Sequence, residues 1–191
     1  MNHDNYDDAY IRTILRGVRS IAVVGASPNT IRPSYFMFKY MLERNYDMIP
    51  INPGQAGKEM LGTTFVASLA DIGRPVDMVD VFRASEHVMP VLDEVLALPV
   101  LPRVFWMQLG VRNDAAAAKA EAAGMKVVMD RCPKIEYGRL SSEISWMGVN
   151  SRTLSSKRAP IPAKGVQRLS LDRQSFGGAN TEAADRTARE K

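Results

Sequence analysis

The segment that most constrains the fold is an apolar run that ends at a glycine and continues into small residues. Residues 21–24 are Ile, Ala, Val and Val, and Gly25, Ala26 and Ser27 follow directly. Because the run contains no polar alternation, it predicts a strand buried on both faces, as in parallel sheets. An amphipathic helix is predicted next, over residues 34–44. A strand, a small-residue turn and a helix N-terminus together can bind an anion, although a tight turn that binds nothing would read the same way.

The same succession of apolar runs and amphipathic segments repeats along the chain. Strands are predicted over residues 20–24, 48–53, 76–82, 104–108 and 125–129. Helices are predicted over residues 7–19, 34–44, 85–98 and 113–124. Strands that alternate with helices indicate βαβ units, a parallel sheet and right-handed crossovers. We therefore predict an α/β, Rossmann-like, doubly wound fold, in which a five-stranded, mostly parallel sheet has helices on both faces. With the strands numbered along the chain, the expected order is 3-2-1-4-5.

Composition divides the 191 residues into a domain and a basic arm. Residues 1–140 hold all the predicted elements, whereas residues 141–191 are rich in Ser, Arg and Lys, contain prolines and have few apolar side chains. We expect this arm to be partly mobile. Residues 151–191 carry nine Lys/Arg against four Asp/Glu, so the net charge of +4 belongs to the arm rather than the domain. A nucleic-acid partner is therefore not indicated for the domain, and a basic arm that contacts RNA or acidic partners is a minor alternative.

The sequence also limits the cell compartment and the kinds of metal site. Cys132 is the single cysteine, which excludes an internal disulfide framework and a cysteine-based metal cluster. The Asp and Glu residues show no metal-ligand spacing. The first ten residues contain three Asp and no Lys or Arg, unlike a secretory signal, and no apolar run is long enough to span a membrane. We expect a cytoplasmic protein that does not associate with membranes.

Polar, glycine and proline residues gather where the predicted strands end. Ligands of open parallel sheets bind outside the carboxyl ends of the strands, so these residues form the candidate binding site. They are Gly25, Ala26, Ser27, Arg32, Pro33, Ser34, Asn52, Pro53, Val81, Phe82, Arg83, Gln108, Leu109, Gly110, Arg131, Cys132 and Pro133. Three arginines and three predicted helix starts at one edge favour a ligand with several phosphates, most simply a nucleotide.

Two features of the sequence argue against a nicotinamide dinucleotide. The fingerprint G-x-G-x-x-G would need glycine where Ser27 and Thr30 stand, two and five residues after Gly25. An NAD site also places an acidic residue after the second strand to bind the ribose, and Asn52 stands there instead. The sequence has no Walker A motif either, so a P-loop nucleotidase is disfavoured.

Six segments in this order resemble a known family: residues 21–27, 32–34, 49–53, 79–83, 106–110 and 128–133. They look like those of the small stand-alone CoA-binding proteins, which are single Rossmann-like domains similar to the CoA-binding domain of the succinyl-CoA synthetase α-subunit. The resemblance extends over about residues 15–140 and leaves the basic arm outside it.

The resemblance implies that CoA or an acyl-CoA binds at the predicted site. Residues 25–27 would contact the phosphates through backbone N–H groups, with Arg32 and Ser34 nearby. The remaining implied roles are the adenosine end for residues 52–53, the path of the ligand for 81–83, the pantetheine arm for 108–110 and the thiol end for 131–133.

No complete catalytic apparatus can be identified in the sequence. No nucleophile stands beside a plausible base, and the chain lacks the phosphohistidine domain and ATP-binding subunit that complete the synthetase. The leading hypothesis is therefore a protein that binds CoA or acyl-CoA without a reaction of its own, and a homo-oligomer is compatible with it. The alternatives are an NAD(P)-dependent oxidoreductase, or a thiol- or acyl-transfer enzyme that uses Cys132. For transfer, Arg131 and a following helix start would lower the pKa of the Cys132 thiol.

Overall fold

The computed structural model describes residues 1–141, and the predicted arm from residue 142 onward lies outside them. Strands and helices alternate along the described part, as predicted. In chain order the elements are α1 (Asp8–Gly17), β1 (Ser20–Val24), α2 (Pro33–Leu42), β2 (Asp47–Ile51), η1 (Pro53–Gln55), β3 (Glu59–Met60), β4 (Thr63–Thr64), η2 (Ala70–Ile72), β5 (Met78–Val81), η3 (Ser85–His87), α3 (Val88–Leu96), β6 (Val104–Met107), α4 (Asp114–Ala122), β7 (Lys126–Val128) and α5 (Pro133–Leu140).

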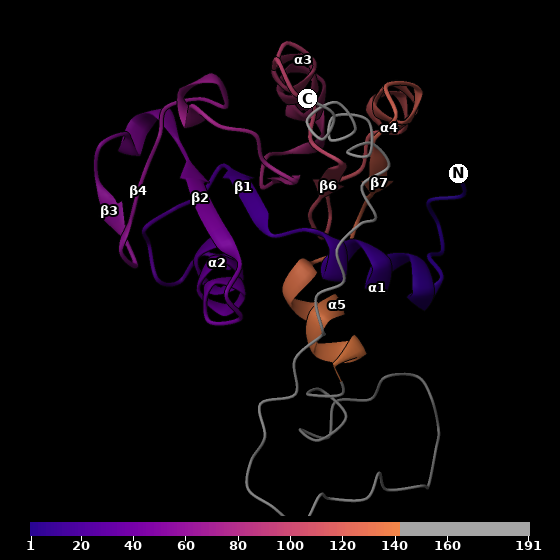
Figure 1. The fold of residues 1–191 in the computed structure, drawn as a ribbon, viewed down its shortest axis with the longest axis horizontal. Helices are drawn as coiled ribbons and strands as arrows, with labels where there is room; N and C mark the ends of the chain where they lie inside the picture. Colours follow the sequence, from indigo (N-terminus) through magenta and orange to yellow (C-terminus); the bar gives the residue numbers. More distant parts are fainter. Residues whose placement is uncertain (142–191) are drawn as a thin grey trace, which may run out of the picture.

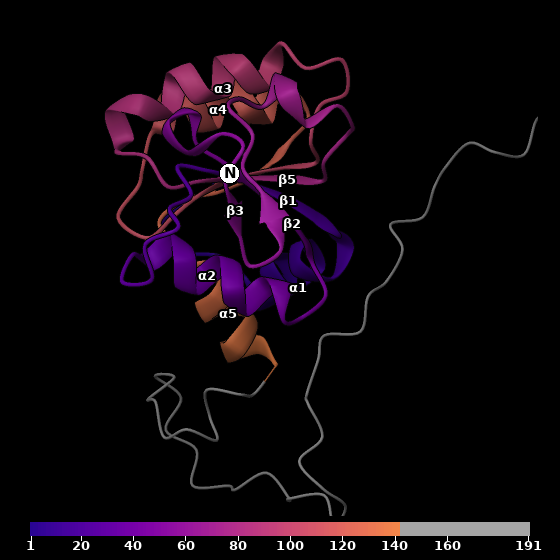
Figure 2. The ribbon, with the colours of Figure 1, turned by 90° about the vertical axis from the view of Figure 1, so that its left-hand side faces the viewer.

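The five longer strands form one parallel sheet between two layers of helices. The strand order is β2-β1-β5-β6-β7, and every neighbouring pair is parallel. Helices α1, α2 and α5 cover one face and α3 and α4 cover the other (Figures 1 and 2). This arrangement confirms the Rossmann-like, doubly wound α/β class predicted from the sequence.

The predicted strand order is wrong in one respect. Numbered along the chain, the five strands lie in the order 2-1-3-4-5, so the third strand, β5, pairs with β1 and not with β2. The chain after β4 occupies the position beside β2 instead: Val66 forms a parallel bridge with Ile51, and its N–H donates to Pro50 O at 3.0 Å. The order therefore reverses between β1 and β5, which is where a ligand is expected in this topology.

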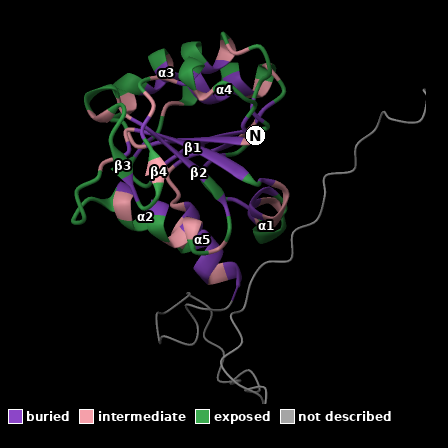
Figure 3. Ribbon diagram, turned by 60° about the vertical axis from the view of Figure 1, so that its left-hand side comes forward, coloured by how far each residue is buried: buried purple, intermediate pink, exposed green. Residues whose placement is uncertain are grey.

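Alternation along the strands divides the core into two apolar layers. On β1, Ile21 and Val23 pack in the layer of α1, α2 and α5, whereas Ala22 and Val24 pack in the layer of α3 and α4. Figure 3 shows the sheet buried throughout its centre, with exposed residues on the outer faces of the helices. Asp80 on β5 is the exception, because a carboxyl group stands where the pattern calls for an apolar side chain.

Two elements lie outside the predicted helices and strands. Helix α5 begins at Pro133, where only a helix start after Arg131 was considered, and packs against α1 and α2. The β3–β4 hairpin lies within residues 54–64, for which no element was predicted. Within residues 1–141, no helix has the length and apolar character needed to cross a bilayer.

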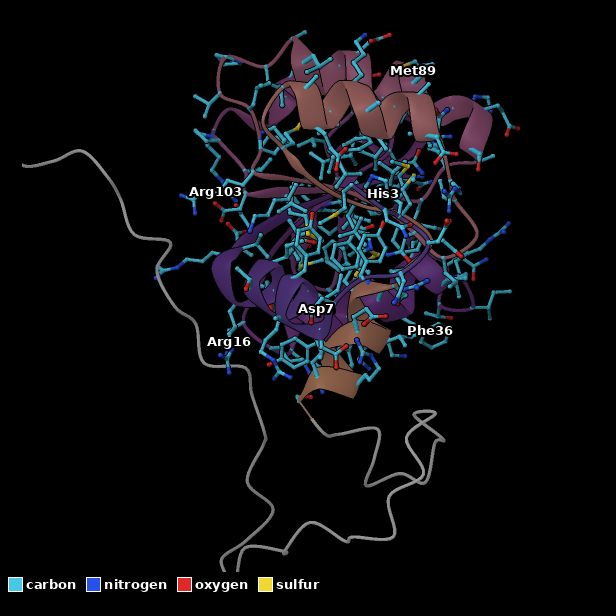
Figure 4. The ribbon with its side chains drawn as sticks, turned by 90° about the vertical axis from the view of Figure 1, so that its right-hand side faces the viewer. His3, Asp7, Arg16, Phe36, Met89 and Arg103 are labelled. Carbon is cyan, nitrogen blue, oxygen red and sulfur yellow. The ribbon has the colours of Figure 1, made fainter. Side chains whose placement is uncertain are left out.

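The N-terminal segment covers the outer edge of β7. Tyr6 Oη accepts a hydrogen bond from Met129 N at 2.7 Å, and Tyr10 Oη donates to Val127 O at 3.1 Å. The two rings stack with centroids 6.0 Å apart. His3, labelled in Figure 4, lies at the level of the sheet between the helix layers, with Nδ1 2.9 Å from Tyr6 Oη. Two tyrosine hydroxyls thus form hydrogen bonds with backbone groups on the outer side of this short edge strand.

Candidate functional site

The turn after β1 requires a glycine. Gly25 has φ +87°, and a Cβ placed there would lie 2.7 Å from Phe82 O, because the ends of β1 and β5 approach closely. The N–H groups of Gly25 and Ala26 donate to Ile51 O at 2.9 and 3.3 Å. They are therefore engaged within the sheet edge, contrary to the phosphate contacts that the resemblance implied for them. For Ser27, no partner of the backbone N–H is found among the described residues.

Asn52 connects the ends of two strands. Its Nδ2 donates to Ala26 O at 2.8 Å, and its Oδ1 accepts from Gly54 N at 3.0 Å. Both polar ends of the amide are thus used to join the end of β2 to the turn after β1. The structure explains why an amide stands at this position, where a dinucleotide site would have an acid.

Arg32 and Arg83 supply unpaired positive charge at the carboxyl edge of the sheet. Arg32 precedes α2 and Arg83 follows β5, and both are exposed. Neither guanidinium forms an ion pair or a hydrogen bond with any residue in 1–141, unlike Arg74 and Arg112, which pair with carboxylates. Since free arginines attract phosphates, these two form the cationic part of the site.

Helix ends add to this positive potential. The N-termini of α2, α3 and α5 have no side-chain cap, whereas Asp7 caps α1 and Asn113 caps α4. Each uncapped helix carries a partial positive charge and backbone N–H groups that water or an anion can satisfy. These are the first α-helices after strands β1, β5 and β7, so their N-termini lie on the side of the sheet to which those strands run, as do Arg32 and Arg83.

Arg131, the third predicted arginine, is directed into the protein's own structure. Its Nη1 donates to Asp130 O at 2.8 Å, and its Nε lies 3.7 Å from Glu136 Oε1. It lines a cavity of about 210 Å³ between the N-terminal segment, α1 and α5. In that cavity Arg139 is also neutralised, by Glu136 at 2.7 Å and Asp8 at 2.6 Å. Of the three arginines predicted to attract phosphates, Arg32 and Arg83 are therefore the two without a partner in residues 1–141.

The other predicted site residues also follow strand ends, with different exposure. Leu109 is 61% exposed, whereas Gln108 before it is buried. Gly110 has φ +79°, and its N–H donates to Asp130 Oδ1 at 2.6 Å, which joins the turn after β6 to the end of β7. Of the others, Ser34 and Pro133 are buried, Phe82 is half-buried, and Pro33 and Pro53 are exposed. Val81 is buried as the last residue of β5.

A buried carboxyl beneath this edge was not predicted as a site residue. Asp80 is 0% exposed, and Gln108 Nε2 donates to its two oxygens at 2.9 and 3.1 Å. Burial raises the pKa of Asp80 to about 8, and the Gln108 hydrogen bond opposes this only in part. The sequence did contain a sign of this residue's unusual role, because Asp80 is a charged residue between two valines in an apolar strand. Strongly shifted carboxyl groups of this kind gather at functional sites.

The environment of Cys132 contradicts the lowered pKa that a transfer reaction would need. Burial raises the pKa of the Cys132 thiol, and the nearby Asp80 carboxyl raises it further. The backbone N–H groups of Ile135 and Lys134 lower it, but less than burial raises it. The side chain packs against the apolar layer under α5, so it is a thiol in a largely apolar setting.

Most of the described part of the chain matches a known protein family. The family described as the CoA binding domain matches residues 19–138, from the start of β1 to α5. The chain belongs to the CoA binding domain family. CoA binding is thus supported for the chain in general terms.

Relatives match between 70% and 73% of this chain. An uncharacterized protein of Bacillus subtilis, YneT, is 38% identical over 133 residues, which are 70% of this chain and 96% of YneT. The solved structure of the cell-free protein ID.343 from Thermus thermophilus is 39% identical with a TM-score of 0.66, covering 71% of this chain and 99% of that one. A hypothetical protein from Pyrococcus horikoshii OT3 is 34% identical with a TM-score of 0.67, covering 73% and 96%.

A resident metal ion has no evident ligands in the domain. Within residues 1–141, no group of three or more His, Cys, Asp or Glu side chains is placed to hold one. Within residues 1–141, the edge thus combines two guanidinium groups without a partner, three helix N-termini without a side-chain cap and a buried polar pair.

Proposed function

We propose that this member of the CoA binding domain family binds CoA, free or as an acyl-CoA, at the carboxyl edge of the sheet. The observation that carries the proposal is the pair of unpaired arginines, Arg32 and Arg83, on either side of the point where the strand order reverses. The phosphates would lie against these guanidinium groups and the open N-terminus of α2. CoA carries a pyrophosphate and a 3′-phosphate, so it can use both arginines at once.

The state of the thiol favours binding over group transfer. Cys132 has a raised pKa, so the reactive thiolate is scarce at neutral pH. The remaining roles that the resemblance implied belong to this proposal as well: adenosine beside Asn52, and the ligand arm beside Gln108. A cytoplasmic location and a homo-oligomer also stay predictions.

The decisive experiment is isothermal titration calorimetry of the full chain with CoA, acetyl-CoA and NADPH. We expect CoA or acetyl-CoA to bind and NADPH not to bind. In the double variant Arg32→Ala/Arg83→Ala, the CoA Kd should rise about 100-fold, because hydrogen bonds to charged groups contribute about 1.5–3 kcal/mol each. Arg103→Ala is the matched control. Figure 4 places Arg103 at the opposite end of the molecule from Phe36, which stands in the first turn of α2.

The outcomes separate the candidate functions. Binding of NADPH without CoA would replace this proposal with the oxidoreductase. A double variant that binds CoA as tightly as the wild type would move the phosphates away from the two arginines. An Arg103→Ala variant that weakens binding as much as the double variant would show a general effect of charge rather than a site.

A further inference from the structure

Asp80 stands where packing alone would favour an apolar residue. In the sheet register its neighbours are Val23 on β1 and Trp106 on β6, and the carboxyl is completely buried. Within the described residues no Lys, Arg or His forms an ion pair with it, and Gln108 is its hydrogen-bond partner. A buried carboxyl without a cation is costly, whereas a valine would add to the core. The position of Asp80 therefore calls for a role other than packing.

The partner of Asp80 is held in a defined orientation. Gln108 lies two residues after Trp106, so it is the diagonal neighbour of Asp80 on the same face of the sheet. A single amide nitrogen, Nε2, contacts both carboxyl oxygens, at 2.9 and 3.1 Å. Gln108 is itself only 4% exposed, although it follows directly on the end of β6. Asp80 thus fixes the plane of a buried amide at the edge where the ligand is proposed.

One polar atom of this amide is left over. Within residues 1–141, Gln108 Oε1 has no hydrogen-bond partner, and it is not one of the buried polar atoms left without one, so it reaches the surface at this edge. When Asp80 is protonated, its hydroxyl can donate to Oε1 after the amide turns over, and Nε2 is then the free atom. In either orientation Gln108 presents one polar atom at the surface, on the side away from Asp80, where water satisfies it in the free protein and a ligand group of matching polarity can replace that water.

We propose that Asp80 is a positioning residue that holds Gln108 for a hydrogen bond to an amide of the ligand's arm. The inference rests on the proposed function, since the pantetheine arm of CoA contains two secondary amides. Each of these amides has one N–H donor and one C=O acceptor, so the arm can match Gln108 in either orientation. The arginines would thus bind the phosphates, and the Asp80–Gln108 pair would recognise the part of CoA that distinguishes it from a plain nucleotide.

The test compares CoA with adenosine 3′-phosphate 5′-diphosphate, which has phosphates but no arm. Titration calorimetry of the full chain gives both dissociation constants for each variant. In Gln108→Met, we expect the Kd for CoA to rise about tenfold while the Kd for the armless nucleotide stays within twofold. Asp80→Leu should raise the Kd for CoA several-fold, because Gln108 then loses its fixed orientation. Asp80→Asn, which keeps a hydrogen-bonding partner, should stay within twofold of the wild type.

Asp77→Asn is the matched control, since Asp77 precedes β5 at the opposite edge of the sheet and accepts hydrogen bonds from Arg19 N and Ser20 N. It should lower the unfolding temperature without changing the ratio of the two constants. A Gln108→Met variant that weakens both ligands equally, or neither, overturns the inference. If that variant does not fold, the comparison of Asp80→Leu with Asp80→Asn decides in the same way. A wild type that binds both ligands equally well overturns the inference alone, whereas one that binds neither overturns the proposed function.

Discussion

The most direct consequence of the buried carboxyl is a stability that falls as the pH rises. Burial raises the pKa of Asp80 from 3.8 to about 8, so the folded protein keeps a proton there after the unfolded chain has lost it. Between these two pH values the folded state binds more protons than the unfolded state. The free energy of unfolding therefore decreases with increasing pH over this window, by about 1.4 kcal/mol per pH unit from this one group. Below the lower value Asp80 has no such effect.

The Asp80→Asn variant isolates this contribution because asparagine does not titrate. Between pH 5 and pH 7, the wild type should lose roughly 2.5 kcal/mol of stability relative to the variant. Urea unfolding at pH 5, 6 and 7, at constant ionic strength, measures both proteins. Other titrating groups cancel in the difference between them, and acid-sensitive ion pairs elsewhere do not obscure the result.

Gln108→Met is the control, because it keeps the carboxyl and its burial and should keep the pH dependence. If the wild type and Asp80→Asn stay a constant difference apart from pH 5 to pH 7, Asp80 does not hold its proton in the folded state. The argument from burial would then be wrong, and a group that compensates the charge would have to be sought beneath the sheet edge.

Two further substitutions test the geometry of the fold. Gly25→Ala should lower the free energy of unfolding by about 3 kcal/mol in urea titration, because φ is +87° and the new Cβ would meet Phe82 O. Gly124→Ala, at a similar φ but with nothing within 4 Å, should cost about 1 kcal/mol, and equal losses at the two positions would contradict the proposed clash. Tyr6→Phe should cost about 1–2 kcal/mol and speed hydrogen exchange at the Met129 amide, since it removes the acceptor of that N–H. An unchanged exchange rate at Met129 would show that another group protects this amide.

The fold class could be predicted from the sequence because it depends on local patterns. The apolar run of residues 20–24 becomes β1 with the predicted bounds, and the predicted helices reappear with ends shifted by a few residues. The strand order could not be predicted in the same way, because it depends on which distant segment pairs with β1. Val66 pairs with Ile51 on the outer side of β2, where the third strand was expected, and nothing in the local sequence predicts this bridge. For helix α5 only the start after Arg131 was considered, because the helix is short and begins at a proline after a strand end.

The sequence predicts that the candidate site residues share one edge of the sheet, but it does not predict their contacts. Residues at strand ends do share one edge, since parallel strands impose this. Whether a polar atom there is free depends on partners far away in the chain, as with the N–H of Gly25, which Ile51 O occupies. The same holds for Arg131, which is close to Glu136. Asp80 was visible in the sequence, but only the three-dimensional structure shows that it is without a cation.

The hydroxyl groups that complete β7 have a consequence for association between chains. A parallel sheet of five strands has two outer strands, and an exposed outer strand invites pairing with another molecule and eventual aggregation. The hydroxyl groups of Tyr6 and Tyr10 cover the outer side of β7, and Val66 covers part of the outer side of β2. Two copies of the domain are therefore hindered from joining their sheets into one. A dimer that formed through the helices or loops instead would leave the sheet of each copy a separate unit.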